Sequence, residues 1–162
     1  TIPDSVTEIG ERAFYDTGLD VLHLPEGVET IGRSAFCKCN YLTSLHIPGS
    51  IKTLPERAFA NCTQLEEVTF SEGVQYVGER AFFNGRNLAG VTFAEGLQRI
   101  EANAFEFTSE EKIWEAVEWL KSYNKLYGFK RMGIIATDGS TYTTDGTING
   151  ISNVEPIASE TV

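Results

Sequence analysis

Residues 24–39 read LPEGVETIGRSAFCKC, and this stretch contains the element that decides the fold. Its Ala-Phe pair recurs at steps of 22, 23, 23 and 23 residues. The copies are Ala13-Phe14, Ala35-Phe36, Ala58-Phe59, Ala81-Phe82 and Ala104-Phe105. A period in this range is the signature of a repeat architecture, so the sequence predicts a stack of about five short coils.

Apolar residues at three other sets of positions keep the same step. The first set is Val6, Val28, Ile51, Val74 and Leu97, and the second is Ile9, Ile31, Leu54, Val77 and Ile100. The third set has L-x-x-L-x-L spacing in the triplets Leu19/Leu22/Leu24, Leu42/Leu45/Ile47, Leu65/Val68/Phe70 and Leu88/Val91/Phe93. One unit is too small to bury these residues by itself, so neighbouring units must stack and share a core.

The triplets alternate with period two, as short strands do. Stacked coils place such strands in a parallel sheet, with about 4.8 Å between neighbouring strands. In this arrangement Leu22 and Leu24 point inward, whereas Val21, His23 and Pro25 point outward from the same strand.

The Ala-Phe segment falls on the opposite side of each coil, where we expect a short helix or a 3₁₀ turn. Gly10, Gly32 and Gly78 follow the Ile/Val position and are expected to serve a tight turn. Pro55 takes that place in the third unit. The predicted fold class is an α/β repeat, a solenoid with a parallel sheet on one face.

These motifs resemble the BspA-like, or Treponema-type, leucine-rich repeats. That family has a run similar to L-P-x-x-V-x-x-I-G-x-x-A-F-x-x-C, which stands here over residues 24–39 and again from Ile51 to Cys62. The resemblance covers residues 1–107, with Thr17, Gly85 and Thr108 where the family often has Cys. It implies a leucine-rich-repeat solenoid from a bacterial, or sometimes protozoan, surface or secreted protein. Several members of that family are adhesins that bind host matrix proteins or other microbes.

The chain opens with Thr1-Ile2-Pro3, which matches His23-Leu24-Pro25 one repeat later. We therefore expect an incomplete first coil in a fragment of a longer protein. An open edge of this kind favours pairing, so the sequence allows a homodimer through the open solenoid edge.

Residues 108–162 depart from the repeat and form a second segment. Thr108 and Glu111 have the spacing of a capping box, and apolar residues then recur at helical spacing, which predicts a helix over 109–126. A strand over 132–136, a turn at Asp138-Gly139 and Tyr142 on a returning strand predict a β-hairpin. The helix and hairpin are expected to form a C-terminal cap, and residues 149–162 have no periodicity.

Within this segment, the run from Gly128-Phe129 through Asp138-Gly139 to Asp145-Gly146 resembles the opening of a Cache-type extracellular sensor domain. The resemblance covers residues 110–151. The ligand-binding segment that usually follows in that family is missing here, so it implies no ligand site.

The net charge of the chain argues against two classes of binding partner. The chain has 13 Lys and Arg against 23 Asp and Glu, a formal net charge of −10. Nucleic-acid binding and docking on an anionic membrane need clustered positive charge, so the composition argues against both. No apolar run approaches the roughly 18 residues of a membrane span, so no membrane insertion is expected.

The three cysteines and two histidines raise the question of a disulfide or a metal site. Cys39 and Cys62 share a repeat position, so they form either a disulfide across coils or, as we favour, two buried thiols. Cys37 is expected to be exposed or to face a helix groove. His23 and His46 also share a position, but they lack a third metal ligand, so we interpret them as polar surface residues.

Catalysis is not predicted. The neighbouring acids Glu66-Glu67 and Glu110-Glu111 face different directions on a strand or helix, so they do not converge on one bond. No Ser/His/acid or Cys/His set is evident. The sequence predicts no enzyme, no catalytic residue, no metal site and no cofactor.

The outward residues of the predicted strands are the candidate binding site: Val21, His23, Ser44, His46, Glu67, Thr69, Gly90 and Thr92. Solenoids usually bind partners on such a face. The first hypothesis is therefore an extracellular or cell-surface adhesion module that recognises a host or microbial surface protein or glycan. A binding module should have a contiguous apolar or aromatic patch on this face. Alternatives are a structural spacer, which should have a uniformly polar face, and part of an extracellular sensor, which needs a pocket in the tail.

Overall fold

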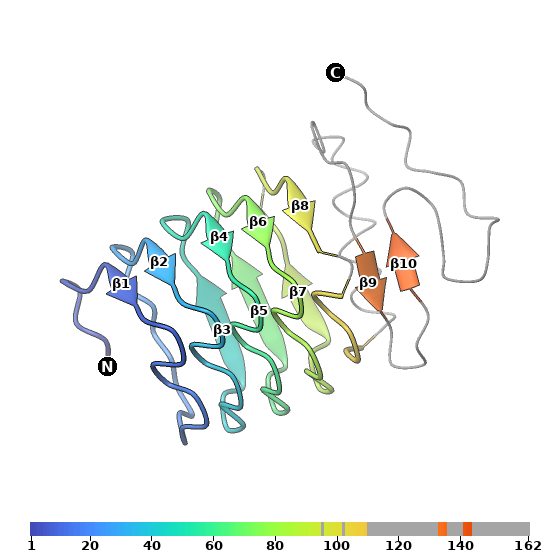
Figure 1. The fold of residues 1–162 in the computed structure, drawn as a ribbon, viewed down its shortest axis with the longest axis horizontal. Helices are drawn as coiled ribbons and strands as arrows, with labels where there is room; N and C mark the ends of the chain where they lie inside the picture. The colour runs from blue at the N-terminus through green and yellow to red at the C-terminus, as the bar shows by residue number, and fades with distance from the viewer. Residues whose placement is uncertain (95, 102, 110–132, 136–140, 144–162) are drawn as a thin grey trace.

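The computed structural model describes residues 1–94, 96–101, 103–109, 133–135 and 141–143. Within residues 1–109 the chain winds into coils that stack along one axis, so that equivalent positions lie side by side (Figure 1). This is the predicted solenoid of stacked repeats.

One side of the stack is a parallel sheet. It consists of β3 (Ser44–Ile47), β5 (Glu67–Phe70) and β7 (Gly90–Thr92) in the order β3-β5-β7. The register pairs Leu45 with Val68 and Val68 with Val91, so each coil is in phase with the next. In β3 and β5 exposed and buried residues alternate, as the triplet pattern predicts.

A second set of parallel strands, each two residues long, runs along another edge of the coils. β1 (Glu8–Ile9) pairs with β2 (Thr30–Ile31). β4 (Thr53–Leu54), β6 (Tyr76–Val77) and β8 (Arg99–Ile100) form a separate ladder. The second residue of every strand is buried, which places the Ile/Leu/Val series of the sequence in the core.

A stack of phenylalanines fills the side of the core opposite the sheet. The ring centroids of Phe14 and Phe36, and of Phe36 and Phe59, lie 5.1 Å apart with interplanar angles of 2°. The stack continues through Phe82 to Phe105 with centroid distances of 5.8 and 5.1 Å. Phe36, Phe59, Phe82 and Phe105 are completely buried, so this column is the continuous centre of the hydrophobic core.

The helix expected around each Ala-Phe pair is wrong, and no helix occurs in the described part of the chain. Alternate amides do close turns by bonding to the carbonyl three residues back, as Ala13 N donates to Gly10 O at 3.2 Å and Tyr15 N donates to Arg12 O at 3.1 Å. Arg12 and Asp16 flank this segment with φ angles of 55° and 57°, in the left-handed region. The amide of Phe14 donates to Ala35 O of the next coil at 2.8 Å, and Asp16 N donates to Cys37 O at 2.8 Å. These amides therefore bond between coils and not within a helix.

The triplet of the second coil does not form a strand, contrary to the prediction. The main chain of residues 21–24 makes no hydrogen bond with β3, and an extended segment becomes a strand only through such pairing. Val21 and His23 still point outward and Leu24 inward. Pro25 is buried, so its predicted outward position is wrong as well.

The glycines after the Ile/Val position have a different role from the one predicted. None of Gly10, Gly32 and Gly78 has a positive φ angle, so the turn does not require their conformational freedom. A Cβ at Gly32 would overlap the main chain of Glu11, and one at Gly78 would lie 2.7 Å from Leu54 O. Glycine is needed there because the backbones of adjacent coils approach closely.

In the C-terminal segment, β9 (Gly133–Ile135) pairs antiparallel with β10 (Thr141–Thr143), with Tyr142 opposite Ile134. These two strands agree with the predicted hairpin. The turn at 138–139, most of the helix predicted over 109–126, and residues 149–162 lie outside the described residues. The cap and the boundary at residue 108 remain predictions.

A matched pair of substitutions tests the close approach of the coils. Gly32→Ala should destabilise the protein by about 1–3 kcal/mol, because the added methyl group must push the neighbouring coil away. Gly10→Ala is the control at the same repeat position, where a Cβ meets nothing within 4 Å. The control should be neutral, or stabilising by up to about 1 kcal/mol. Urea denaturation measures both, and equal losses would contradict the assignment.

Candidate functional site

The sheet presents two columns of outward side chains. Ser44 on β3 is in register with Glu67 on β5, which is in register with Gly90 on β7. His46, Thr69 and Thr92 form the second column. All six residues are exposed. The structure therefore brings together six of the eight predicted site residues on one surface, hereafter the sheet face.

The remaining two predicted residues, Val21 and His23, lie on the second coil before this sheet begins, and both are exposed. Val21 is 76% exposed and is the only large apolar residue of the eight. Polar groups dominate the sheet face itself. A partner that binds there must be recognised chiefly through hydrogen bonds and charge.

His46 is the most connected residue of the sheet face. Its Nε2 atom lies 3.0 Å from Ser71 Oγ, one coil further, and 3.8 Å from Glu26 Oε1, one coil back. These contacts hold the imidazole across three successive coils. The interpretation of His46 as a polar surface residue agrees with this setting.

The cysteines lie in the interior. All three are free thiols and all are buried, so the expectation that Cys37 is exposed is wrong. Cys39 Sγ donates to Phe14 O and Cys62 Sγ donates to Phe36 O, each at 3.3 Å. Burial raises the pKa of both thiols above the usual range. The favoured interpretation as buried thiols is confirmed, and their role is to satisfy a carbonyl of the preceding coil.

Sequence reasoning missed a second surface, the turn face that carries the Ala-Phe segments. A groove of about 390 Å³ lies there, and Arg12, Arg33, Arg57 and Arg80 line it. The signal was present in the recurring Glu-Arg-Ala-Phe, which repeats one arginine in three coils. The stacking of the coils is what brings these arginines together on one surface.

The described residues support neither a metal site nor a membrane-spanning helix. Among residues 1–109, without 95 and 102, and the two C-terminal strands, no group of three or more His, Cys, Asp or Glu side chains is placed to hold a metal ion. The same residues include no helix of the length and apolar character needed to cross a membrane.

Comparison with known proteins identifies the class and then the family. The stacked coils and parallel sheet define a leucine-rich-repeat solenoid. A family model described as "BspA type Leucine rich repeat region (6 copies)" matches residues 1–111. The chain belongs to the BspA-type leucine-rich repeat family. The match ends before most of the segment that resembles a Cache domain, so it gives that resemblance no support.

Solved structures of leucine-rich repeat proteins share the fold. A leucine-rich repeat protein from Eubacterium ventriosum is 29% identical with a TM-score of 0.62, and one from Bacteroides ovatus is 25% identical with a TM-score of 0.60. A leucine-rich cell surface protein from Faecalibacterium prausnitzii, at 24% identity and a TM-score of 0.52, shows the fold alone.

The alignments cover 67%, 66% and 86% of this chain, but only 31%, 34% and 41% of those proteins, in the same order. The chain thus spans about a third of their length. A search of curated proteins gives no match.

The state of the cysteines yields a direct prediction. In the native protein Cys39 and Cys62 should react with iodoacetamide at least about tenfold more slowly than in urea, because the thiolate is the reactive form and burial disfavours it. Mass spectrometry after timed alkylation measures the labelled fraction at each site. Complete labelling in the native protein, or a mass short by two hydrogens, would contradict buried free thiols.

Proposed function

We propose that this chain is a binding module at the surface of a bacterial cell or in the secreted fraction, and that it recognises a protein or glycan through the sheet face. The observation that carries the proposal is the register of the two outward columns. Because equivalent residues repeat one strand spacing apart, the sheet face is a regular array of hydrogen-bonding groups. Such a surface suits an extended polar partner.

The family and its relatives support the location. One similar structure is described as a cell surface protein, and members of this family are often surface-exposed. The chain acts as a binding module in this proposal and not as an enzyme. Its partner would be a host or microbial surface molecule that makes polar contacts with His46, Thr69 and Glu67.

A structural spacer is the second candidate function. The polar character of the sheet face favours it, because a repeat that only separates other domains needs a solvated surface and no apolar anchor. Val21, exposed beside the face, is the feature that a spacer does not require. The sensor alternative depends on residues 110–151, most of which lie outside the described residues.

A binding screen separates these functions. The purified chain is tested against immobilised matrix proteins and a glycan array, together with His46→Glu and Thr69→Arg. If the sheet face is the site, each substitution should weaken binding at least about tenfold, because it places a repelling or bulky group at the centre of the contact.

Thr53→Arg is the matched control, because Thr53 is also an exposed threonine on a strand but belongs to β4 on another side of the coil. It should leave binding unchanged. No binding to any ligand would favour the spacer, and equal losses with Thr53→Arg and Thr69→Arg would place the site elsewhere.

A further inference from the structure

The groove on the turn face concentrates positive charge in an acidic protein. Four successive coils each contribute one arginine to its lining, and Glu11 is the single acidic residue among the lining side chains. The whole chain carries a formal charge of −10. The lining therefore carries more positive than negative groups, although Glu56 and Glu106 pair with three of its arginines from beside the groove.

The backbone fixes the spacing of these arginines. Arg12, Arg57 and Arg80 occupy the same repeat position with φ angles of 55°, 55° and 54°. Arg12 N donates to Arg33 O, and Arg57 N donates to Glu79 O, each at 3.0 Å between coils. Because these bonds join adjacent coils, Arg57 and Arg80 lie one coil spacing of about 4.8 Å apart, whereas Arg12 and Arg57 lie two spacings apart with Ser34 between them in the column.

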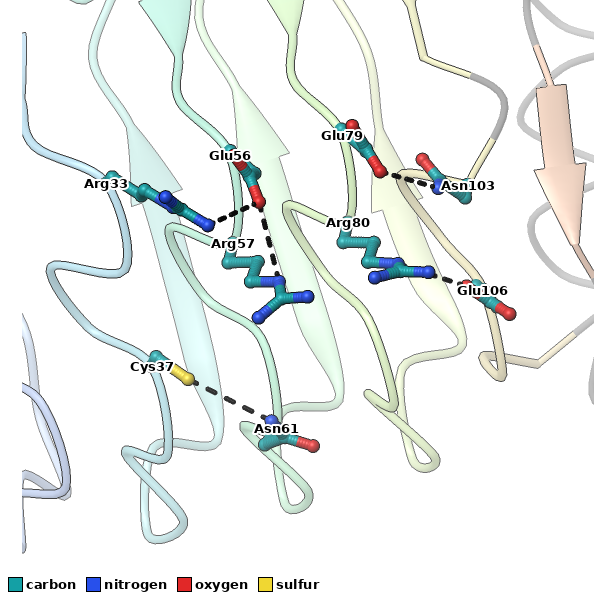
Figure 2. A network of polar contacts seen from close by, with 9 residues as sticks. All are labelled: Arg33, Cys37, Glu56, Arg57, Asn61, Glu79, Arg80, Asn103 and Glu106. Carbon is teal, nitrogen blue, oxygen red and sulfur yellow. Dashed lines mark hydrogen bonds and ion pairs between the residues drawn. The ribbon is translucent and has the colours of Figure 1, made fainter.

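Arg33 completes the row because the second coil departs from the Glu-Arg pattern. It stands in the column of Glu11, Glu56 and Glu79, where its Nη2 atom donates to Glu56 Oε1 at 3.0 Å. Figure 2 shows Arg33, Arg57 and Arg80 following one another across the coils of this face. The ion pair uses one of the five donor hydrogens of the Arg33 guanidinium.

Carboxylates of the chain satisfy the other arginines only in part. Arg57 Nε and Arg80 Nε lie 3.6 Å from Glu56 Oε1 and Glu106 Oε2, beyond hydrogen-bond distance. Arg80 Nε is buried without a hydrogen-bond partner. Within the described part of the chain, the terminal amino groups of Arg57 and Arg80 donate no hydrogen bond, and Arg12 has no acidic partner.

Aromatic rings hold two of the guanidinium groups in place. Arg12 lies over the ring of Tyr15 at 4.2 Å from the centroid, and Arg80 lies 5.7 Å from that of Phe83. Such contacts orient the planar group without using its donors. The donors stay available for planar or tetrahedral anions, which guanidinium binds in pairs of hydrogen bonds.

We propose that this groove binds a linear acidic glycan through its sulfate or carboxylate groups, on the face opposite the sheet face. A polysaccharide with regularly spaced charges matches a row with one guanidinium per coil. An acidic peptide fits less well, because the amides of residues 12–16 are all hydrogen-bonded within the solenoid and leave none for a peptide main chain. The site is independent of the proposed function of the sheet face.

The test measures binding of the full chain to a heparin oligosaccharide, which is sulfated, and to an oligogalacturonate, which is carboxylated. Neutral dextran and polyglutamate are the comparison ligands. At least one acidic glycan should bind more tightly than polyglutamate, and the affinity should fall steeply with salt. The stronger of the two glycans identifies the anion. Binding of neither glycan, or equal or tighter binding of polyglutamate, would overturn the proposal.

Variants locate the site. The double variant Arg57→Gln with Arg80→Gln should weaken glycan binding by roughly tenfold or more, because two charged donors are lost. Glu56→Gln should strengthen binding severalfold, since it frees Arg33 and Arg57, and a misfolded protein would not gain affinity. Arg99→Gln is the control for the loss of a positive charge outside the groove, because Arg99 pairs with Glu101 away from it; it removes one charge against the two of the double variant. Equal loss with Arg99→Gln, or no gain with Glu56→Gln, would overturn the assignment.

Discussion

The face-to-face contact between equivalent phenylalanines of successive coils sets the register on which the rest of the structure depends. The rings of Phe14, Phe36 and Phe59 lie 5.1 Å apart, close to the spacing of about 4.8 Å between paired strands. The same coil-to-coil step therefore satisfies ring stacking and main-chain hydrogen bonding. A shift of one residue would turn the column of rings out of the core, so the 23-residue period is held by packing and by polar pairing together.

Both candidate surfaces are consequences of this register. Once the coils are in phase, each position of the repeat becomes a column on the outside of the molecule. On the sheet face the column of His46 contains Thr69 and Thr92, and on the turn face the column of Arg12 contains Arg57 and Arg80. One residue that differs from the others in its column, such as Arg33 among glutamates, then changes the charge of the groove on the turn face.

Features that depend on the repeat period and on the alternation of apolar and polar residues can be predicted from the sequence. The inward position of Leu45, Val68 and the Phe column follows from period and polarity, and so do the six strand residues of the sheet face. The conformation of the turn face does not follow, because a helix and a chain of left-handed turns both bury Phe36. Asp16, Asn61 and Asn84 tolerate the left-handed region, but Arg12 and Lys38 give no such signal. The burial of Cys37 and the arginine groove depend on contacts between coils, which one repeat does not encode.

A double-mutant cycle tests the central role of the stack most directly. Phe36→Leu and Phe59→Leu are combined, since these rings are in contact, and Phe36→Leu and Phe82→Leu are combined as the separated pair. Urea denaturation gives the free energy of unfolding of each variant. If the stack sets the register, the coupling energy should exceed about 0.5 kcal/mol for the contacting pair, and the effects should add within about 0.5 kcal/mol for the separated pair. Additive effects for the contacting pair would show that the phenylalanines stabilise their own coils and do not set the register.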